Sequence, residues 1–265
     1  MGHQIEKDER FWVVAALLAA FHADDRTDAL TAVLRDALGP VPPVAGLGTW
    51  AEALGPEQDL QLYFEVNLPA PSGYKRALAR DLGAHTLVPW QRTIAEGYVQ
   101  RAGEDGVPAL EGATKVDAVL LAPSTGFAVA FEAKVLPDTS SHTTYDARRN
   151  QIARNLDVLL DDHSKSGLRG GPAQRRPDLT CFVLLTPEVF RKQPSARLYG
   201  HLMKRYEADA EALREHLPHR DLVELAGLRG RLGWTSWERL ADLVPGACRW
   251  LAPPAADHLQ EDQAA

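Results

Sequence analysis

The sequence predicts an α/β fold in which helices cover the faces of a mixed sheet. Two observations lead to this prediction. From residue 60 onward, short runs rich in β-branched and aromatic residues alternate with stretches that repeat apolar residues at helical spacing. The chain also has 265 residues, of which 45% are hydrophobic, and this is enough to bury a large core in one domain with added segments.

Residues 1–59 are predicted to form a helical segment ahead of the sheet. Two helices are expected within 10–38, joined at the polar sequence HADDRTD. The second helix places four apolar residues near one face, namely Leu30, Val33, Leu34 and Leu38. The proline- and glycine-rich stretch 39–48 ends the helical pattern and is the predicted linker.

The predicted core spans 60–217 and contains all the strands that the pattern indicates. Strands are expected at 60–68, at 115–136, where two apolar runs flank a turn at Ser124, Thr125 and Gly126, and at 179–187. Helices are expected at 72–83, 143–162 and 195–217, the second with Thr143 and Asp146 at the spacing of a capping box. Residues 84–110 fit no single element.

The last segment, 218–265, is predicted to add short helices to this core. Three tryptophans, Trp234, Trp237 and Trp250, are its expected core anchors, because large aromatic side chains bury the most surface. The acidic stretch 257–265 is expected to be a disordered tail.

Charge and cysteine content limit the class of protein. The formal net charge is −7 and the pI about 5.7, so the whole chain is no basic coat for nucleic acid. The two cysteines, Cys181 and Cys248, are too few for a zinc site or a disulfide scaffold. The apolar run 11–21 is shorter than the roughly 20 residues that span a bilayer, and no signal peptide precedes it. We therefore expect a cytoplasmic protein without a membrane partner.

The paired runs at 115–136 contain charges that an ordinary buried strand lacks. Alternation places Glu132 and Lys134 on one face of the second run, and the hairpin turn brings Asp117 roughly alongside Glu132. One interpretation is an ordinary set of strand-end charges, which contribute little to stability. The other is a divalent-cation site, since two converging carboxylates repel each other and Mg²⁺ binds one or two carboxylates together with phosphate.

The spacing and placement of these charges resemble a known active site. Asp117 on the first strand, followed by Glu-Ala-Lys at 132–134 on the second, is similar to the motif of the PD-(D/E)XK nuclease superfamily. The proline that usually precedes the aspartate is Val116 here. The resemblance covers roughly residues 60–217 and implies a restriction-endonuclease-like fold, with helical segments added at both ends.

The resemblance also implies roles for individual residues. Asp117 and Glu132 would bind one or two Mg²⁺ or Mn²⁺ ions, with the Ala133 carbonyl as a further ligand. Lys134 would orient and help to deprotonate the attacking water. Members of the superfamily often carry another acid upstream, for which the candidates here are Glu111, Glu96 and Glu65.

The predicted helix after the hairpin supplies the remaining candidates. Arg148, Gln151 and Asn155 fall at i, i+3 and i+7 and form a polar stripe, which on its own is also typical of a solvated helix face. Several families of the superfamily carry a glutamine on this helix, so Gln151 is expected to face the metal site. Arg148 or Arg149, together with Asn155, is expected to contact the substrate.

The distribution of basic residues favours a polyanionic substrate. Between 134 and 205 there are thirteen Lys and Arg against seven acids, although the whole chain is acidic. The glycine-rich loop 165–178, which contains Arg175 and Arg176, is the expected backbone clamp.

The function predicted from these observations is a metal-dependent DNA endonuclease, in a setting such as bacterial defence that follows from the superfamily alone. The expected partner is nucleic acid, DNA rather than RNA, bound by a homodimer or a larger defence complex. A binding or scaffold subunit of the same fold and a ribonuclease with the same site are the alternatives. A glycosidase that uses Asp117 and Glu132 fits the basic surroundings poorly.

Overall fold

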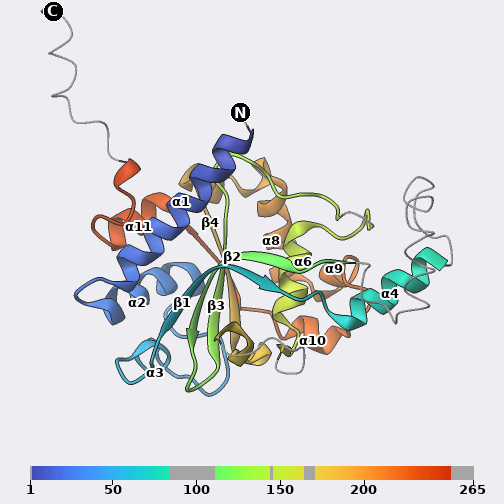
Figure 1. Cartoon of the computed structure of the whole chain (residues 1–265), viewed down its shortest axis with the longest axis horizontal. Coiled ribbons are helices and arrows are strands. Elements are labelled where there is room, and N and C mark those ends of the chain that lie inside the picture. Colours follow the sequence, from blue (N-terminus) through green and yellow to red (C-terminus); the bar gives the residue numbers. More distant parts are fainter. Residues whose placement is uncertain (1, 84–110, 144–145, 164–170, 252–265) are drawn as a thin grey trace, which may run out of the picture.

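The computed structural model describes residues 2–83, 111–143, 146–163 and 171–251. Its centre is a five-stranded mixed sheet in which the strands follow chain order (Figure 1). The strands are β1 (Gln61–Leu68), β2 (Thr114–Ala122), β3 (Phe127–Ala133), β4 (Thr180–Thr186) and β5 (Leu232–Ser236). The first three are antiparallel to one another, and β4 and β5 run parallel to β3. The predicted α/β class and mixed sheet are confirmed.

Helices lie on both faces of the sheet (Figure 1). One face is covered by α1 (Gly2–Phe21), α2 (Arg26–Leu38), α3 (Trp50–Leu54) and α11 (Trp237–Leu243). The other is covered by α6 (Gln151–Leu159), α8 (Leu198–Ala208), α9 (Ala210–Arg214) and α10 (Leu222–Ala226). The remaining helices are α4 (Ser72–Gly83), α7 (Glu188–Lys192) and the 3-10 turns Gly171–Gln174, Pro177–Leu179, Pro194–Ala196 and Arg249–Leu251.

The alternation along β3 explains why this strand is the centre of the fold. Phe127, Val129 and Phe131 pack into the core beneath α1 and α2, whereas Ala128 and Ala130 pack into the core beneath α6 and α8. Each large apolar side chain buried in this way stabilises the fold by about 1.5–3 kcal/mol. The residues of β3 on the second of these faces are therefore small.

The hairpin between β2 and β3 turns where the sequence predicts. Gly126 has φ 77°, and its N–H donates to the Ala122 carbonyl at 2.9 Å. A Cβ atom at this position would lie 2.7 Å from the Arg176 side chain. Glycine is therefore required both by the backbone conformation and by the neighbouring side chain.

The strand β5 contradicts the prediction that the last segment is helical. Residues 232–236 extend the sheet beside β4, and Gly233 makes this fit, since a Cβ there would lie 2.8 Å from Leu38. Among the predicted anchors, Trp237 is buried, whereas Trp234 and Trp250 are partly buried. The sheet therefore crosses the boundary predicted at residue 217.

The helix predicted over 143–162 is wrong in its first half. Thr143 and Asp146 exchange backbone hydrogen bonds as an isolated β-bridge instead of capping a helix. The helix α6 begins only at Gln151, because the Asn150 side chain accepts from the Ala153 N–H at 2.9 Å and acts as the N-cap. Residues 147–150 therefore precede the helix and do not share its faces.

The long helix predicted over 195–217 is divided into two. Asp209 has an extended backbone, and its side chain accepts from the Glu211 N–H at 2.9 Å, so that it ends α8 and caps α9. Three predicted regions lie wholly or partly outside the described residues: 84–110, which contains Glu96, the loop 164–170, and the tail from 252 onward. Within the described residues, no helix combines the length and apolar composition needed to cross a membrane.

Candidate active site

A cleft of about 430 Å³ opens at the end of β3. Its walls come from α1, β2, β3, α6 and the loop that follows β3. Four carboxylates of the described residues line it: Glu9, Asp117, Glu132 and Asp138. Such a concentration of acids in one cleft is costly unless cations or hydrogen bonds offset their repulsion.

Asp117 and Glu132 occupy opposite positions on β2 and β3. The register pairs Ala118 with Phe131, so the preceding and following residues face each other, with Cβ atoms about 5 Å apart. The Ala133 N–H donates to Asp117 Oδ2 at 2.8 Å and fixes this carboxylate against the neighbouring strand. The structure thus brings together the two carboxylates that the sequence singles out, with Ala133 beside them.

Glu132 is held by three side chains. Its Oε1 accepts from Lys134 Nζ at 2.8 Å and from Gln151 Nε2 at 2.7 Å, and its Oε2 accepts from Asn155 Nδ2 at 2.9 Å. The residue is only 2% exposed. A buried carboxylate needs such charge-assisted bonds, and they fix its orientation.

The helix α6 supplies two of these partners from adjacent turns. Gln151 is itself oriented, because its Oε1 accepts from the Ser140 N–H and the Thr139 hydroxyl, each at 3.3 Å, which leaves its amide N–H₂ for Glu132. Asn155, expected to contact substrate, is buried against Glu132. This expectation is wrong, and Asn155 instead positions the carboxylate.

Arg149 is not available to a substrate either. Its side chain is 0% exposed, pairs with Asp157 at 2.7 Å and lies over the Tyr74 ring, 3.5 Å from the centroid. Arg148 is half-exposed but pairs with Asp81 and Asp146, and it lines neither the cleft nor the adjoining one that contains Gln151. The structure therefore places neither arginine at the candidate site.

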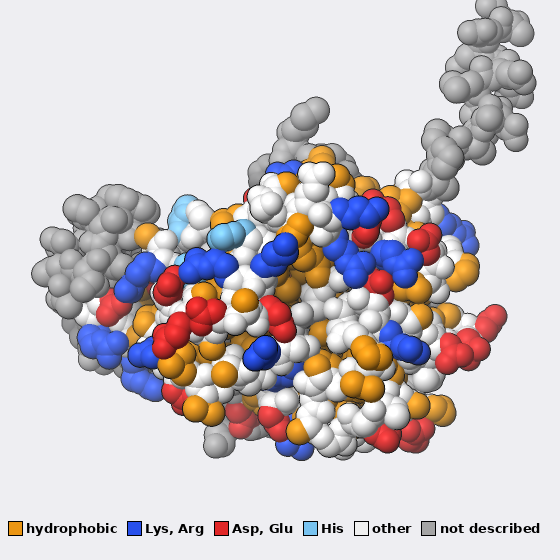
Figure 2. Space-filling view, turned by 180° about the vertical axis from the view of Figure 1, so that it is seen from behind, with side chains coloured by type: hydrophobic (Ala, Val, Ile, Leu, Met, Phe, Trp, Pro, Cys, Tyr) orange, Lys and Arg blue, Asp and Glu red, His pale blue; other side chains and the backbone are white. Residues whose placement is uncertain are grey.

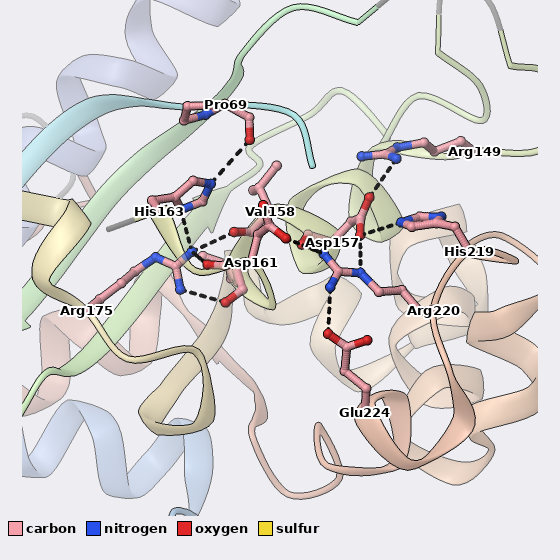
Figure 3. A network of polar contacts seen from close by, with 11 residues as sticks. Pro69, Arg149, Asp157, Val158, Asp161, His163, Arg175, His219, Arg220 and Glu224 are labelled. Carbon is pink, nitrogen blue, oxygen red and sulfur yellow. Dashed lines mark hydrogen bonds and ion pairs between the residues drawn. The ribbon is translucent and has the colours of Figure 1, made fainter. Parts of the chain in front are cut away.

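The pair formed by Arg149 and Asp157 belongs to a buried network that fixes α6 (Figure 3). Asp157 also contacts His219 Nε2 at 2.9 Å and Arg220 Nε at 2.7 Å. Burial alone would raise the pKa of Asp157, but the His219 hydrogen bond and the guanidinium charges outweigh it and lower that pKa. The network joins α6 to the segment before α10, which carries His219 and Arg220 (Figure 3).

Asp138 and Glu9 are further acids of the cleft that the sequence did not predict, and Glu9 reaches it from α1. Its Oε1 accepts from the Val135 N–H at 2.6 Å, across 126 positions of the chain. The predicted candidate Glu111 is buried away from the cleft and pairs with Arg154 at 2.7 Å. No motif links Glu9 to the hairpin, and its sequence signal is only that of a carboxylate two residues ahead of Phe11, where the apolar run of α1 begins.

The other described candidate, Glu65, lies within β1 and has a left-handed backbone conformation. Phe64 packs against one core and Val66 against the other, and Glu65 between them has φ 53°. This backbone costs about 1–2 kcal/mol for an L-residue. Its exposed ion pairs with Arg10 and Lys115 contribute about 0–1 kcal/mol each, so they offset the strain at best.

The end of β3 is also fixed from the far end of the chain. The Lys134 N–H donates to the Leu185 carbonyl at 2.9 Å, and Trp237 Nε1 donates to the Lys134 carbonyl at 3.3 Å. The backbone on both sides of the lysine is therefore anchored, by Glu9 on the side of α1 and by Trp237 on the side of α11.

The Lys134 side chain remains an ammonium ion in these surroundings. Burial alone would lower its pKa, but the charge of Glu132 and the hydrogen bond to it outweigh burial and raise that pKa. A protonated lysine stabilises negative charge and cannot accept a proton. This differs from the expectation that Lys134 helps to deprotonate water.

The Asp117 carboxyl also favours its protonated form, which in its case is the neutral one. Burial, followed by the negative charge of Glu132, raises its pKa from 3.8 to about 8, against the opposing effects of the Ala133 N–H and Lys134. In the metal-free chain the Asp117 carboxyl therefore holds a proton near neutral pH. Repulsion of this kind between two carboxylates is relieved by a divalent cation.

We expect the metal-free chain to lose stability as the pH rises from about 4 to about 8. Over this interval the folded chain keeps a proton on Asp117 that the unfolded chain releases, so rising pH favours unfolding. The Asp117→Asn variant lacks this group and should be more stable than the parent at pH 8 but not at pH 4. Denaturant unfolding in EDTA measures the difference, and an equal difference at both values would contradict the raised pKa.

The donor set at the cleft suits Mg²⁺ or Mn²⁺ better than a soft metal. Asp117 and Glu132 supply carboxylate oxygens, and Mg²⁺ commonly uses one or two carboxylates and completes its shell with water and phosphate. Among the described residues, no three His, Cys, Asp or Glu side chains form a ready-made metal cluster. An ion here would therefore depend on water or substrate for the rest of its ligands.

The basic character predicted for 134–205 is largely neutralised in the fold. Four arginines of this segment pair with acids from outside it: Arg148 with Asp81, Arg154 with Glu111, Arg191 with Asp36 and Arg205 with Glu215. Figure 2 accordingly shows basic and acidic side chains interspersed over one face.

Part of the glycine-rich loop, from residue 171 onward, lies within the described residues. Arg175 is buried and donates to the carbonyls of Val158 and Leu159, each at 2.6 Å, at the end of α6. Arg176 is exposed and pairs with Asp178. Arg175 therefore stabilises the fold at the end of α6 and is too buried to contact a substrate.

No protein-family model, curated protein or solved structure matches the chain. The chemistry of the cleft is therefore inferred from its own residues and their geometry.

Proposed function

We propose that the chain is a metal-dependent phosphodiesterase that cleaves nucleic acid, DNA in preference to RNA, and that its sheet is of the restriction-endonuclease-like type. One observation carries the proposal. Asp117 and Glu132 face each other at the end of a hairpin, and Lys134 is bonded to Glu132. The combination of two carboxylates and an ammonium group in one cleft suits a reaction in which negative charge builds on a phosphoryl group.

The arrangement of strands and helices supports the proposed fold. A hairpin carries the acidic residues, a parallel strand β4 follows a helix, and helices cover both faces of the sheet. The order of these elements is the one that the resemblance to PD-(D/E)XK nucleases implies. Strand β5 and the helices α1 and α2 add to that core.

The residues at the hairpin end of the cleft have distinct parts in the proposed mechanism. Asp117 and Glu132, with the Ala133 carbonyl, would hold Mg²⁺ or Mn²⁺, which supplies Lewis-acid polarisation of the phosphodiester. Gln151 orients Glu132 through its amide N–H₂. Lys134, as an ammonium ion, stabilises the charge that develops on the phosphoryl oxygens.

The test is a cleavage assay on plasmid and single-stranded DNA with Mg²⁺, Mn²⁺ or EDTA. The parent should cut only with a metal ion, and Asp117→Asn should lower the rate at least about 100-fold because one ligand and its charge are lost. Asp178→Asn is the matched control, since this exposed aspartate pairs with Arg176 beside the hairpin turn. Cleavage that persists in EDTA, or an equal loss in both variants, would contradict the proposal.

One observation favours a second candidate, a nuclease-like binding or scaffold subunit. Both carboxylate oxygens of Glu132 already accept hydrogen bonds from protein side chains, so the residue is satisfied without a metal. Retained binding of DNA without cleavage under any metal condition would support this candidate. Cleavage of RNA but not DNA in the same assay would instead support the ribonuclease.

A further inference from the structure

Within the part of the chain that the structure describes, two cations besides Lys134 face the cleft, and both come from its α1 and β2 side. They are Arg10, at the start of the apolar part of α1, and Lys115, two residues before Asp117 on β2. Their side chains are 56% and 42% exposed, so they can reach a ligand that enters from solvent. The sequence gives no reason to group them, because they are far apart in the chain.

Glu65 holds these two cations at one place. Its Oε1 lies 3.5 Å from Arg10 Nε, and its other oxygen is bonded to Lys115. Among the described residues, Glu65 is the sole non-glycine residue with positive φ, and it lies on β1 opposite Asp117. Backbone strain of this kind persists where the surrounding structure or the function requires it.

Because the cleft is lined by carboxylates, a polyanion can bind there only if cations at the edge of the cleft offset the repulsion. Four carboxylates line the cleft, and Lys134 is already bonded to one of them. A nucleic-acid backbone that approaches the carboxylates is repelled unless neighbouring cations neutralise its phosphates. Glu65 can neutralise only one of Arg10 and Lys115, so the group keeps a net positive charge.

The sequence did not predict that cations on the α1 and β2 side of the cleft could contact a substrate. Of the residues expected to contact substrate, Arg149 and Asn155 are buried and Arg148 lines neither cleft. Arg10 and Lys115 are the cations whose side chains are both exposed and part of the cleft wall among the described residues.

We propose that Arg10 and Lys115, held together by Glu65, form a subsite for the phosphates that flank the scissile bond of a nucleic acid. This inference rests on the proposed function. It places the backbone of the substrate along the α1 and β2 side of the cleft. The ligand is a phosphodiester chain, recognised by charge and not by base sequence.

The subsite is tested by steady-state cleavage of a labelled DNA oligonucleotide at several salt concentrations. Arg10→Ala and Lys115→Ala should each raise KM about ten-fold and leave kcat within about two-fold, because a charge-assisted phosphate contact is lost from substrate binding. Each should also lower the slope of log(kcat/KM) against log[salt] by about 0.7–0.9. Arg176→Ala, at an exposed ion-paired arginine near the hairpin turn, is the matched control.

Two comparisons make the result decisive. An unchanged KM in the Arg10→Ala/Lys115→Ala double variant, or an equal rise in KM in Arg148→Ala, would overturn the subsite while leaving the proposed function intact. Fluorescence anisotropy measures binding of the same oligonucleotide to the Asp117→Asn variant, with and without the added substitutions Arg10→Ala and Lys115→Ala. If the parent does not cut, the proposed function fails. Loss of binding that is confined to the variants with Arg10→Ala and Lys115→Ala would still support the subsite.

Discussion

Replacing Lys134 with methionine is expected to lower the cleavage rate about 100- to 1,000-fold and to destabilise the metal-free chain by about 3 kcal/mol. The rate should fall because the variant lacks the ammonium group that the proposed mechanism uses to stabilise phosphoryl charge. Stability falls because Glu132, which is 2% exposed, is left buried without the cation 2.8 Å away. Urea unfolding in EDTA and the plasmid assay with Mg²⁺ measure the two effects separately.

A double variant separates stability from catalysis. Lys134→Met with Glu132→Gln removes both charges, and the free energy of unfolding should return to within about 1 kcal/mol of the parent. Activity should remain absent, because the carboxylate ligand and the ammonium group are both gone. Recovery of cleavage in the folded double variant would show that neither residue takes part in the reaction.

The second large effect is expected at the buried network behind α6. Asp157→Asn leaves Arg149 buried without a counter-charge, since both side chains are 0% exposed and pair at 2.7 Å. We expect a loss of about 3–5 kcal/mol in the free energy of unfolding at pH 7. Denaturant midpoints, compared at equal m-values, measure this loss.

The pH dependence of that loss has a definite sign. The pKa of Asp157 is lowered below its ordinary value of 3.8, so its contribution is complete above that value and disappears as the pH falls below it. The difference between parent and Asp157→Asn should therefore shrink in acid. Glu224→Gln, at the outer and 32% exposed end of the same network, is the control and should cost less than about 1 kcal/mol. Equal losses in the two variants would argue against a buried charge pair as the cause.

The hairpin and its carboxylates could be predicted because they depend on local patterns. Alternation along 127–134 is a property of consecutive residues, and Gly126 marks the turn. Strand β5 could not be predicted in the same way. It has five residues, two of which are a glycine and a partly buried tryptophan, and its place is set by Leu38 and by β4.

The residues around the site also divide into those that a local sequence pattern predicts and those whose place depends on distant contacts. Gln151 reaches Glu132 as expected, because it lies on the helix that follows the hairpin strand. Arg149 and Asn155 were misassigned, because the helix starts at the Asn150 cap and because their burial depends on partners elsewhere in the chain. Long-range contacts of this kind leave no periodic trace in the sequence.

The hydrogen bond from Trp237 to the Lys134 carbonyl affects when the cleft can form as the chain is synthesised. Lys134 and Trp237 are 103 positions apart in the chain, and Glu9 and Val135, which also form a hydrogen bond here, are 126 positions apart. During synthesis the chain emerges from its N-terminus, and contacts between distant segments form late. A nascent chain that has not reached residue 237 has the acids of the hairpin but lacks the support of the lysine backbone. The backbone support of Lys134 is therefore complete only after residue 237 has been synthesised.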